Sequence, residues 1–191
     1  EAYARAQVRE IRYADASGNL LDTSAAVANE AFRRSQIRLI YDNGLEVWVN
    51  GHLEDNWQVP GAELPPGGYL VQSPDGRLGV SCSLVDGRRV DQVCSPAYDY
   101  LDGRGKLLAN AQGAANRQLI ILKHAKGARE AIPFQSTRFA VAVKQAPRDL
   151  TALDEEGEEI GPATGVLKEG LFTITPVAGA FSYRWTAIEN Q

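Results

Sequence analysis

The sequence predicts a mainly β protein, built from antiparallel β-sandwich or barrel units that follow a short helical N-terminal lead-in. From residue 35 onward, turn residues (Asn, Asp, Pro and Gly) recur about every 8–12 residues, which is typical of antiparallel sandwiches and barrels. The short runs between these turns alternate apolar and polar residues, as half-buried strands do. Hydrophobic residues make up 44% of the 191 residues, enough to exclude a wholly disordered chain.

Composition and charge exclude several other classes of protein. The net charge of −4 and the pI near 5.3 argue against a broad nucleic-acid interface, so no nucleic acid is expected among the partners. No apolar run approaches the roughly 18 residues of a membrane span, and none is predicted. The chain begins with Glu1 and lacks the pattern of a signal peptide, which favours an excised fragment or a processed protein.

Residues 1–34 are predicted to form the helical lead-in. Two Ala-rich pieces, 2–8 and 24–32, have helical spacing, and Asp22 can cap the second piece. Isolated helices shorter than about 12–15 residues are marginal in water, so both pieces must dock on something else. In an excised fragment, the part of the protein on which they dock is expected to be partly missing.

The first β unit is predicted over residues 35–112. Runs 36–41 and 45–49 flank Asn43-Gly44, and an Asn-Gly pair between alternating runs is the strongest local signal for a hairpin. Asp86-Gly87 predicts a second hairpin between runs 78–83 and 90–94.

The second β unit is predicted over residues 113–191, after a stretch of small residues at 105–116. The sequence leaves open whether the two units share one core. The expected strands of the second unit are 118–122, 131–134, 139–143, 150–153, 171–175 and 181–187. Asp154 to Gly157 predicts an acidic hairpin tip.

The two cysteines, Cys82 and Cys94, flank the Asp86-Gly87 turn and are candidates for a disulfide. They lie at unequal distances from the turn, so a bridge across neighbouring strands requires a bulge or a longer loop. Two unrelated buried thiols are the alternative, and the sequence leaves both open. Two cysteines without clustered histidines do not make a zinc site, and no metal is expected.

No catalytic residue and no cofactor is predicted. The chain lacks a Gly-x-Ser-x-Gly elbow, a P-loop, a dinucleotide fingerprint and a His-Glu-x-x-His helix. His52 and His124 are expected to be surface loop residues. The acidic residues at 154–159 favour a solvated loop tip over a catalytic carboxylate pair, with a calcium site as the minor alternative.

Trp57 is the tryptophan least committed to an alternating strand, and polar residues flank it. Trp48 and Trp185 lie within alternating runs and are expected in the core. Trp57, with Asn56 and Asp55, is therefore predicted to be partly exposed and to form the sugar-binding surface, where an aromatic ring stacks on a pyranose. A core position beneath the Leu64-Pro65 segment is the alternative.

Several turn and packing motifs resemble a known arrangement. They are the run from Tyr41 to Gly51, Asn56-Trp57, the run from Leu64 to Leu70, and the run from Asp86 to Asp91, with similar pieces at 95–98 and 102–105. Together they resemble the C-terminal β-rich accessory region of large secreted bacterial glycoside-hydrolase-like proteins. In that family the catalytic carboxylates lie on an upstream barrel, so the resemblance implies no catalytic residue in this chain. The lead-in, residues 1–34, is similar to the end of that barrel, where the chain leaves it.

The leading hypothesis is a non-catalytic, carbohydrate-associated accessory module of an extracellular glycoside-hydrolase-like protein, which caps a catalytic domain or binds glycan. Its expected partners are a glycan and an upstream catalytic domain or other protein chains, and its expected location is secreted or at the cell surface. The alternative is a structural cell-surface or filament-type β-sandwich with no small-molecule ligand. An aromatic platform beside polar groups on an exposed face favours the first hypothesis, and an exposed edge strand that pairs with another chain favours the second.

Overall fold

The computed structural model describes residues 4–187 and confirms the predicted mainly β class. Strands account for 48% of the chain and helices for 7%, and the strand pairs are antiparallel. The chain divides into two compact units, Glu1–Cys94 (unit 1) and Ser95–Gln191 (unit 2). None of the helices among the described residues is long and apolar enough to cross a membrane.

The division between the units differs from the predicted one after residue 112. The stretch of small residues at 105–116, expected to separate two β units, instead contains short strands of unit 2. One of these, β12 (Gly113–Ala115), pairs with β15 (Phe139–Ala142), so the stretch is tied into the second unit by backbone hydrogen bonds. Low side-chain volume at 105–116 reflects close strand packing: a Cβ on Gly113 would lie 2.5 Å from the Ala140 carbonyl oxygen.

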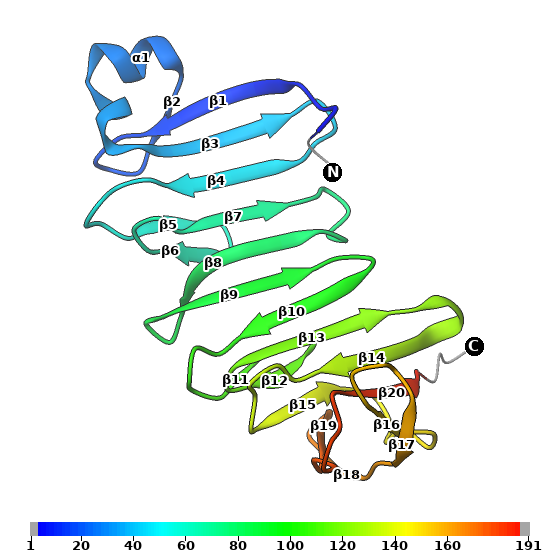
Figure 1. Cartoon of the computed structure of the whole chain (residues 1–191). Helices are drawn as coiled ribbons and strands as arrows, with labels where there is room; N and C mark the ends of the chain where they lie inside the picture. The colour runs from blue at the N-terminus through cyan, green and yellow to red at the C-terminus, as the bar shows by residue number, and fades with distance from the viewer. Residues whose placement is uncertain (1–3, 188–191) are drawn as a thin grey trace. The chain divides into compact units, whose positions relative to one another are not determined.

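Unit 1 is a meandering antiparallel sheet with the strand order β9-β8-β7-β4-β3-β1-β2, and a small hairpin formed by β5 and β6 (Figure 1). Its elements are β1 (Val8–Ala14), β2 (Leu20–Leu21), α1 (Thr23–Ala28), η1 (Ala31–Arg34), β3 (Gln36–Tyr41), β4 (Glu46–Asn50), β5 (Trp57–Val59), β6 (Ala62–Leu64), β7 (Tyr69–Gln72), β8 (Gly79–Val85) and β9 (Arg88–Cys94).

The lead-in is less helical than the sequence predicts. Of the first expected helix, residues 1–3 lie outside the described part of the chain, and the remainder runs through a turn into β1. β1 pairs with β3 along most of its length, and this long-range pairing overrides the helix propensity of the alanines. The second expected helix is split into α1 and η1, and the Asp22 side chain caps α1 by accepting a hydrogen bond from the Ala25 N–H, as predicted.

Both predicted hairpins of unit 1 form at their turn residues. β3 and β4 pair around Asn43-Gly44, where Gly44 has a φ of +80° and the Asn43 side chain accepts a hydrogen bond from the Leu45 N–H. β8 and β9 pair around Asp86-Gly87, with φ values of +50° and +70°. At Asp86-Gly87, positive φ at both central residues matches the right-handed twist of the flanking strands. At Asn43-Gly44 the glycine alone has a positive φ.

Replacing Gly44 with valine should lower the free energy of unfolding by more than about 1 kcal/mol. The left-handed φ strains any β-branched residue, and a Cβ at this position would lie 3.1 Å from Pro74 Cγ. Urea unfolding of Gly44→Val beside Gly76→Val separates the two effects, because Gly76 has a φ of +69° but open space around its missing Cβ. Equal stability of Gly44→Val and the parent chain would contradict the turn assignment.

Unit 2 contains two sheets, with the strand orders β17-β16-β20-β14-β13-β10 and β11-β12-β15-β19-β18. Its further elements are β10 (Tyr98–Asp102), β11 (Leu108–Ala109), β13 (Gln118–Lys123), η2 (Ala125–Gly127), β14 (Ala128–Ile132), β16 (Thr151–Leu153), β17 (Glu159–Pro162), β18 (Gly165–Lys168), β19 (Leu171–Ile174) and β20 (Ser182–Thr186).

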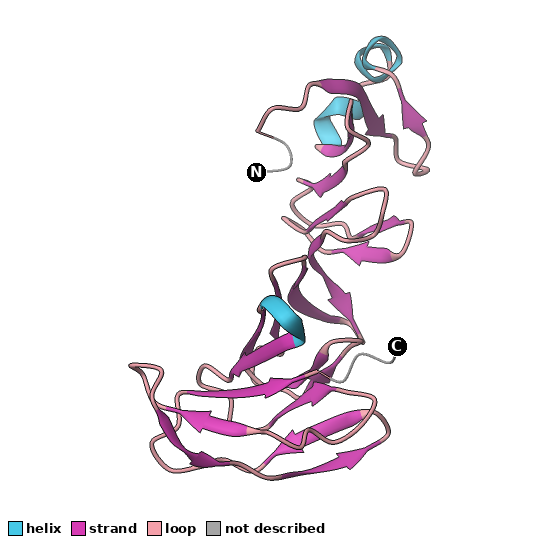
Figure 2. Cartoon of the chain, turned by 90° about the vertical axis from the view of Figure 1, so that its right-hand side faces the viewer, coloured by secondary structure: helices cyan, strands magenta, loops and turns pink. Residues whose placement is uncertain are grey.

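The two sheets of unit 2 enclose its hydrophobic core, as in a β-sandwich (Figure 2). Phe139 of β15 packs on Tyr183 of β20 with 5.6 Å between ring centroids, so the two sheets meet through their apolar faces. The remaining core side chains alternate along the strands of both sheets. They include Leu101, Leu119, Ile121, Val141, Ala152, Phe172 and Ile174.

Candidate functional site

The predicted exposed position of Trp57 is wrong. Its side chain is only 5% exposed and packs edge to face on Trp48, with 5.4 Å between ring centroids. Ala14, Val59 and Leu64 complete this cluster, which is the core between the sheet of unit 1 and the β5–β6 hairpin. The indole face is therefore covered, and Trp57 lies in the core, which was the alternative to an exposed position.

Asp55 and Asn56 are exposed, but each already has a partner. The Asp55 carboxylate accepts a hydrogen bond from Arg34 at 3.0 Å, and the Asn56 amide donates to Glu63 Oε1 at 2.8 Å. These contacts fasten the loop that leads into β5. Without an accessible aromatic ring between them, the two side chains do not form the stacking platform that the sequence analysis expected.

The predicted disulfide is also wrong. Strand pairing places Cys82 opposite Asp91 and Cys94 opposite Gly79, so the cysteines are offset by three residues along adjacent strands, which is about 10 Å. Burial raises the pKa of the Cys82 thiol, and its sulfur accepts a hydrogen bond from Arg89 Nε at 2.8 Å. Cys82 is a buried structural thiol.

The histidines and the acidic hairpin tip have structural roles. His52 Nδ1 accepts a hydrogen bond from the Asp55 N–H at 2.9 Å, and His124 Nε2 lies 3.2 Å from Glu130 Oε2. At the tip between β16 and β17, Asp154 accepts backbone hydrogen bonds from Glu156 and Glu158. Within residues 4–187, no cluster of three or more His, Cys, Asp or Glu side chains is arranged to hold a metal ion.

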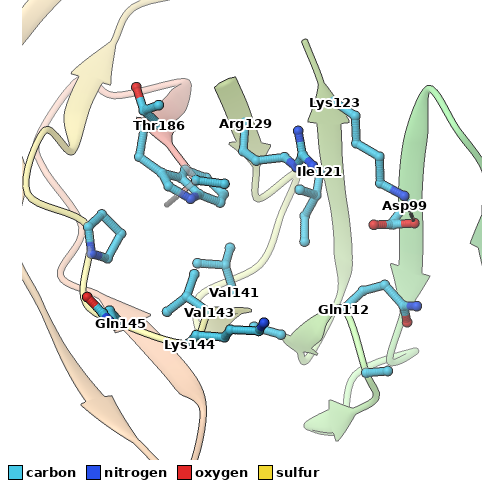
Figure 3. Close-up of a pocket in the computed structure, with 15 residues that line it drawn as sticks. Asp99, Gln112, Ile121, Lys123, Arg129, Val141, Val143, Lys144, Gln145 and Thr186 are labelled. Carbon is cyan, nitrogen blue, oxygen red and sulfur yellow. Dashed lines mark hydrogen bonds and ion pairs between the residues drawn. The ribbon is translucent and has the colours of Figure 1, made fainter. Parts of the chain in front are cut away.

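A pocket of about 570 Å³ opens at one end of the unit 2 sandwich. Strand register brings Lys123, Arg129 and Trp185 side by side on β13, β14 and β20, at the rim of one sheet. Val141 and the segment that follows β15 form the opposite wall, with Lys144 beside them (Figure 3). The pocket therefore lies between the two sheets, where their edges diverge.

The three cationic side chains of this pocket differ in whether a described carboxylate neutralises them. Lys123 Nζ lies 2.7 Å from the buried carboxylate of Asp99, and the two charges neutralise each other (Figure 3). Arg129 makes no ion pair with any described residue, and its one hydrogen bond is to the carbonyl of the adjacent Ala128. Lys144 is exposed and likewise has no carboxylate partner in the described part of the chain. Among residues 4–187, Arg129 and Lys144 are therefore the two cations of the pocket without an ion-pair partner.

Trp185 adds an aromatic side chain to the pocket wall. The predicted core position is confirmed, because the side chain is 4% exposed. Its indole N–H is buried and has no hydrogen-bond partner among the described residues. A buried donor without a partner costs about 1–3 kcal/mol. The Trp48 indole N–H in the core of unit 1 is buried without a described partner in the same way, so this feature alone does not mark a site.

The opposite face of the same strands carries a separate polar network around Glu130. The Glu130 carboxylate accepts hydrogen bonds from Ser182 Oγ at 2.8 Å and from Arg184 at 2.9 Å. Burial raises the pKa of Glu130, but the hydrogen bonds from Ser182 and Arg184 outweigh it, and the net pKa lies below the ordinary value. With every oxygen partnered, this network supports β14 beneath the pocket.

Unit 1 carries a second surface of functional interest, on the sheet face opposite Trp48. Aliphatic residues from neighbouring strands lie in one register row across the sheet, and none of them is buried. We call this row the aliphatic face: Ile11, Leu39, Val47, Val71, Val80 and Val93. On the same face, Val49 and Tyr69 of the adjacent row are each 36% exposed.

Comparison with protein-family models, with curated protein sequences and with solved structures finds no match. The fold and the two surfaces are therefore interpreted on their own geometry. They define a mainly β chain with a partly exposed apolar sheet face in one unit and a cationic pocket in the other.

The sequence analysis singled out neither surface. The aliphatic residues were assigned to strands, but the shared row depends on strand register across the whole sheet. Lys123, Arg129 and Trp185 are brought together in the same way. Alternation within run 118–123 does place Lys123 on the face of Leu119 and Ile121, which was an available signal of a charged residue at the core edge.

Proposed function

We propose that this chain is a non-catalytic accessory module of an extracellular glycoside-hydrolase-like protein, and that unit 1 caps the catalytic domain of that protein through the aliphatic face. The observation that supports this proposal is the aliphatic face itself. A row of side chains across six strands about 4.8 Å apart, with its neighbouring row, covers on the order of 400 Å². Apolar patches of this size are the largest that ordinary monomers carry, and they are often functional.

The chemistry of the face favours a folded domain as its occupant. The row contains only aliphatic residues, and valine at four of its positions gives a flat surface with little conformational freedom. Amphipathic helices, such as those on the outside of an α/β barrel, pack on such a surface through their own apolar stripe. The secreted setting and the carbohydrate association of the parent protein follow from the family resemblance in the sequence.

A paired substitution tests the capping role. The double variant Val47→Lys/Val80→Lys places two charges within the aliphatic face. The control variant Val27→Lys/Leu53→Lys adds the same two charges outside this face, at side chains that are 59% and 89% exposed. In the isolated chain, we expect the first pair to reduce binding of an apolar fluorescent dye severalfold, and the control pair to leave it unchanged. Circular dichroism checks that both pairs retain the strand content.

The natural full-length protein provides the decisive measurement. We expect it to contain a glycoside-hydrolase-like domain, to bind little dye, and to become protease-sensitive between its domains when Val47 and Val80 carry lysine. A natural protein of only 20.7 kDa would contradict the proposal. A dimer of the isolated chain that the Val47/Val80 pair dissociates, measured by light scattering, would instead favour the alternative of a self-assembling structural module.

A further inference from the structure

We infer that the pocket of unit 2 binds an acidic saccharide, a sugar that carries a carboxylate. This inference is independent of the capping role, because it concerns a different unit and different residues. The pocket volume of about 570 Å³ lies within the usual range of roughly 300–1,000 Å³ for small-ligand sites.

The need for an anionic group follows from the charge balance. Asp99 neutralises Lys123, whereas Arg129 and Lys144 have no carboxylate partner among the described residues of a chain whose overall charge is −4. The positive charge is therefore local to this pocket. A guanidinium without an ion-pair partner offers two parallel N–H groups, which match the geometry of a carboxylate.

The rest of the lining suits a sugar ring. Ile121, Val141 and Val143 provide an aliphatic surface for the C–H groups of a pyranose, and Figure 3 places them between the cationic side chains. The amides of Gln112 and Gln145 can donate to and accept from hydroxyl groups. A small inorganic anion would use only the cations, whereas an acidic saccharide would use all three kinds of lining.

The geometry also assigns the leading role to Arg129. Its register partners are Lys123 on one side and Trp185 on the other, so it lies at the middle of the rim. Its neighbour Glu130 is fastened on the other face of β14 by Ser182 and Arg184, which fixes the strand that carries the guanidinium. Lys144 approaches from the opposite wall and adds charge without a fixed partner.

Calorimetric titration of the chain with oligogalacturonate and oligoglucuronate tests the inference. We expect binding that weakens with salt, at least about tenfold loss of affinity for Arg129→Gln, and a smaller loss for Lys144→Gln. Arg117→Gln is the matched control, because Arg117 is exposed on unit 2 and does not line the pocket. Its affinity should equal that of the parent chain.

Three further titrations decide the chemistry. The fully methyl-esterified oligogalacturonate keeps the ring and removes the charge, so equal binding of the ester would overturn the role of the carboxylate. Inorganic phosphate that binds as tightly as the oligosaccharides would indicate an anion site that does not recognise sugars. Absence of binding by every acidic saccharide would overturn the inference and leave the capping proposal intact, since the dye and protease measurements do not involve this pocket.

Discussion

Truncating Trp57 to alanine should lower the free energy of unfolding of unit 1 by about 3–5 kcal/mol, the usual cost of removing a large aromatic side chain from a core. The ring is 5% exposed and packs on Trp48 at 5.4 Å. The β5–β6 hairpin that carries it is short, and two short strands are not stable alone. Loss of the indole would remove the main contact that holds this hairpin on the sheet.

Urea unfolding followed by far-UV circular dichroism measures this loss. Leu53→Ala is the control, because Leu53 is 89% exposed and its truncation should change stability by less than about 0.5 kcal/mol. Unchanged stability of Trp57→Ala together with weaker saccharide binding would restore the original prediction of a sugar-stacking residue.

The misassignment of Trp57 has a clear physical origin. The sequence analysis interpreted its polar neighbours as a solvent-exposed binding loop, whereas those neighbours bind other parts of unit 1: Asp55 contacts Arg34, and Asn56 contacts Glu63. Trp57 and Val59 are buried while Gln58 between them is exposed. A three-residue alternation is too short to be recognised as a strand without its partner β6.

Local features of the fold were predictable from the sequence because their causes are local. Asn43-Gly44 and Asp86-Gly87 adopt the turn conformations that their residue types favour, and the flanking strands follow from alternation. Features that depend on register were not predictable. The offset of Cys82 from Cys94, which prevents the disulfide, is an exception: β8 and β9 pair without a bulge, so the offset follows from the unequal distances of the two cysteines from the Asp86-Gly87 turn.

The candidate sites belong to the second kind. Arg129 and Trp185 are 56 residues apart in sequence (185 − 129) and become direct neighbours only when β14 pairs with β20. The aliphatic face likewise requires the correct alignment of the six strands β1, β3, β4, β7, β8 and β9. A shift of one residue in any pair would send those side chains to the other face.

Replacing Glu130 with glutamine should destabilise unit 2 by about 1–3 kcal/mol at neutral pH, the range for hydrogen bonds to a charged group. The carboxylate is 8% exposed and accepts hydrogen bonds from Ser182 and Arg184. The carboxylate accepts from Ser182 on one of its oxygens and from Arg184 on the other. The amide of glutamine has a single acceptor oxygen, because its nitrogen can only donate. One of the two contacts would be lost, and the charge attraction to Arg184 with it.

The pH dependence of this loss is the sharper test. The net pKa of Glu130 in the folded chain lies below the ordinary value of 4.5, since the hydrogen bonds from Ser182 and Arg184 outweigh the effect of burial. A carboxyl with a lowered folded pKa stabilises the protein at pH above its unfolded pKa, and this contribution disappears as the pH falls through the folded pKa. The difference in the free energy of unfolding between the parent chain and Glu130→Gln should therefore be constant from about pH 6 to about pH 8 and shrink below pH 4.5.

Glu158→Gln at the exposed hairpin tip is the control. A difference for Glu130→Gln that persists unchanged in acid would show that the carboxylate charge contributes nothing to the network.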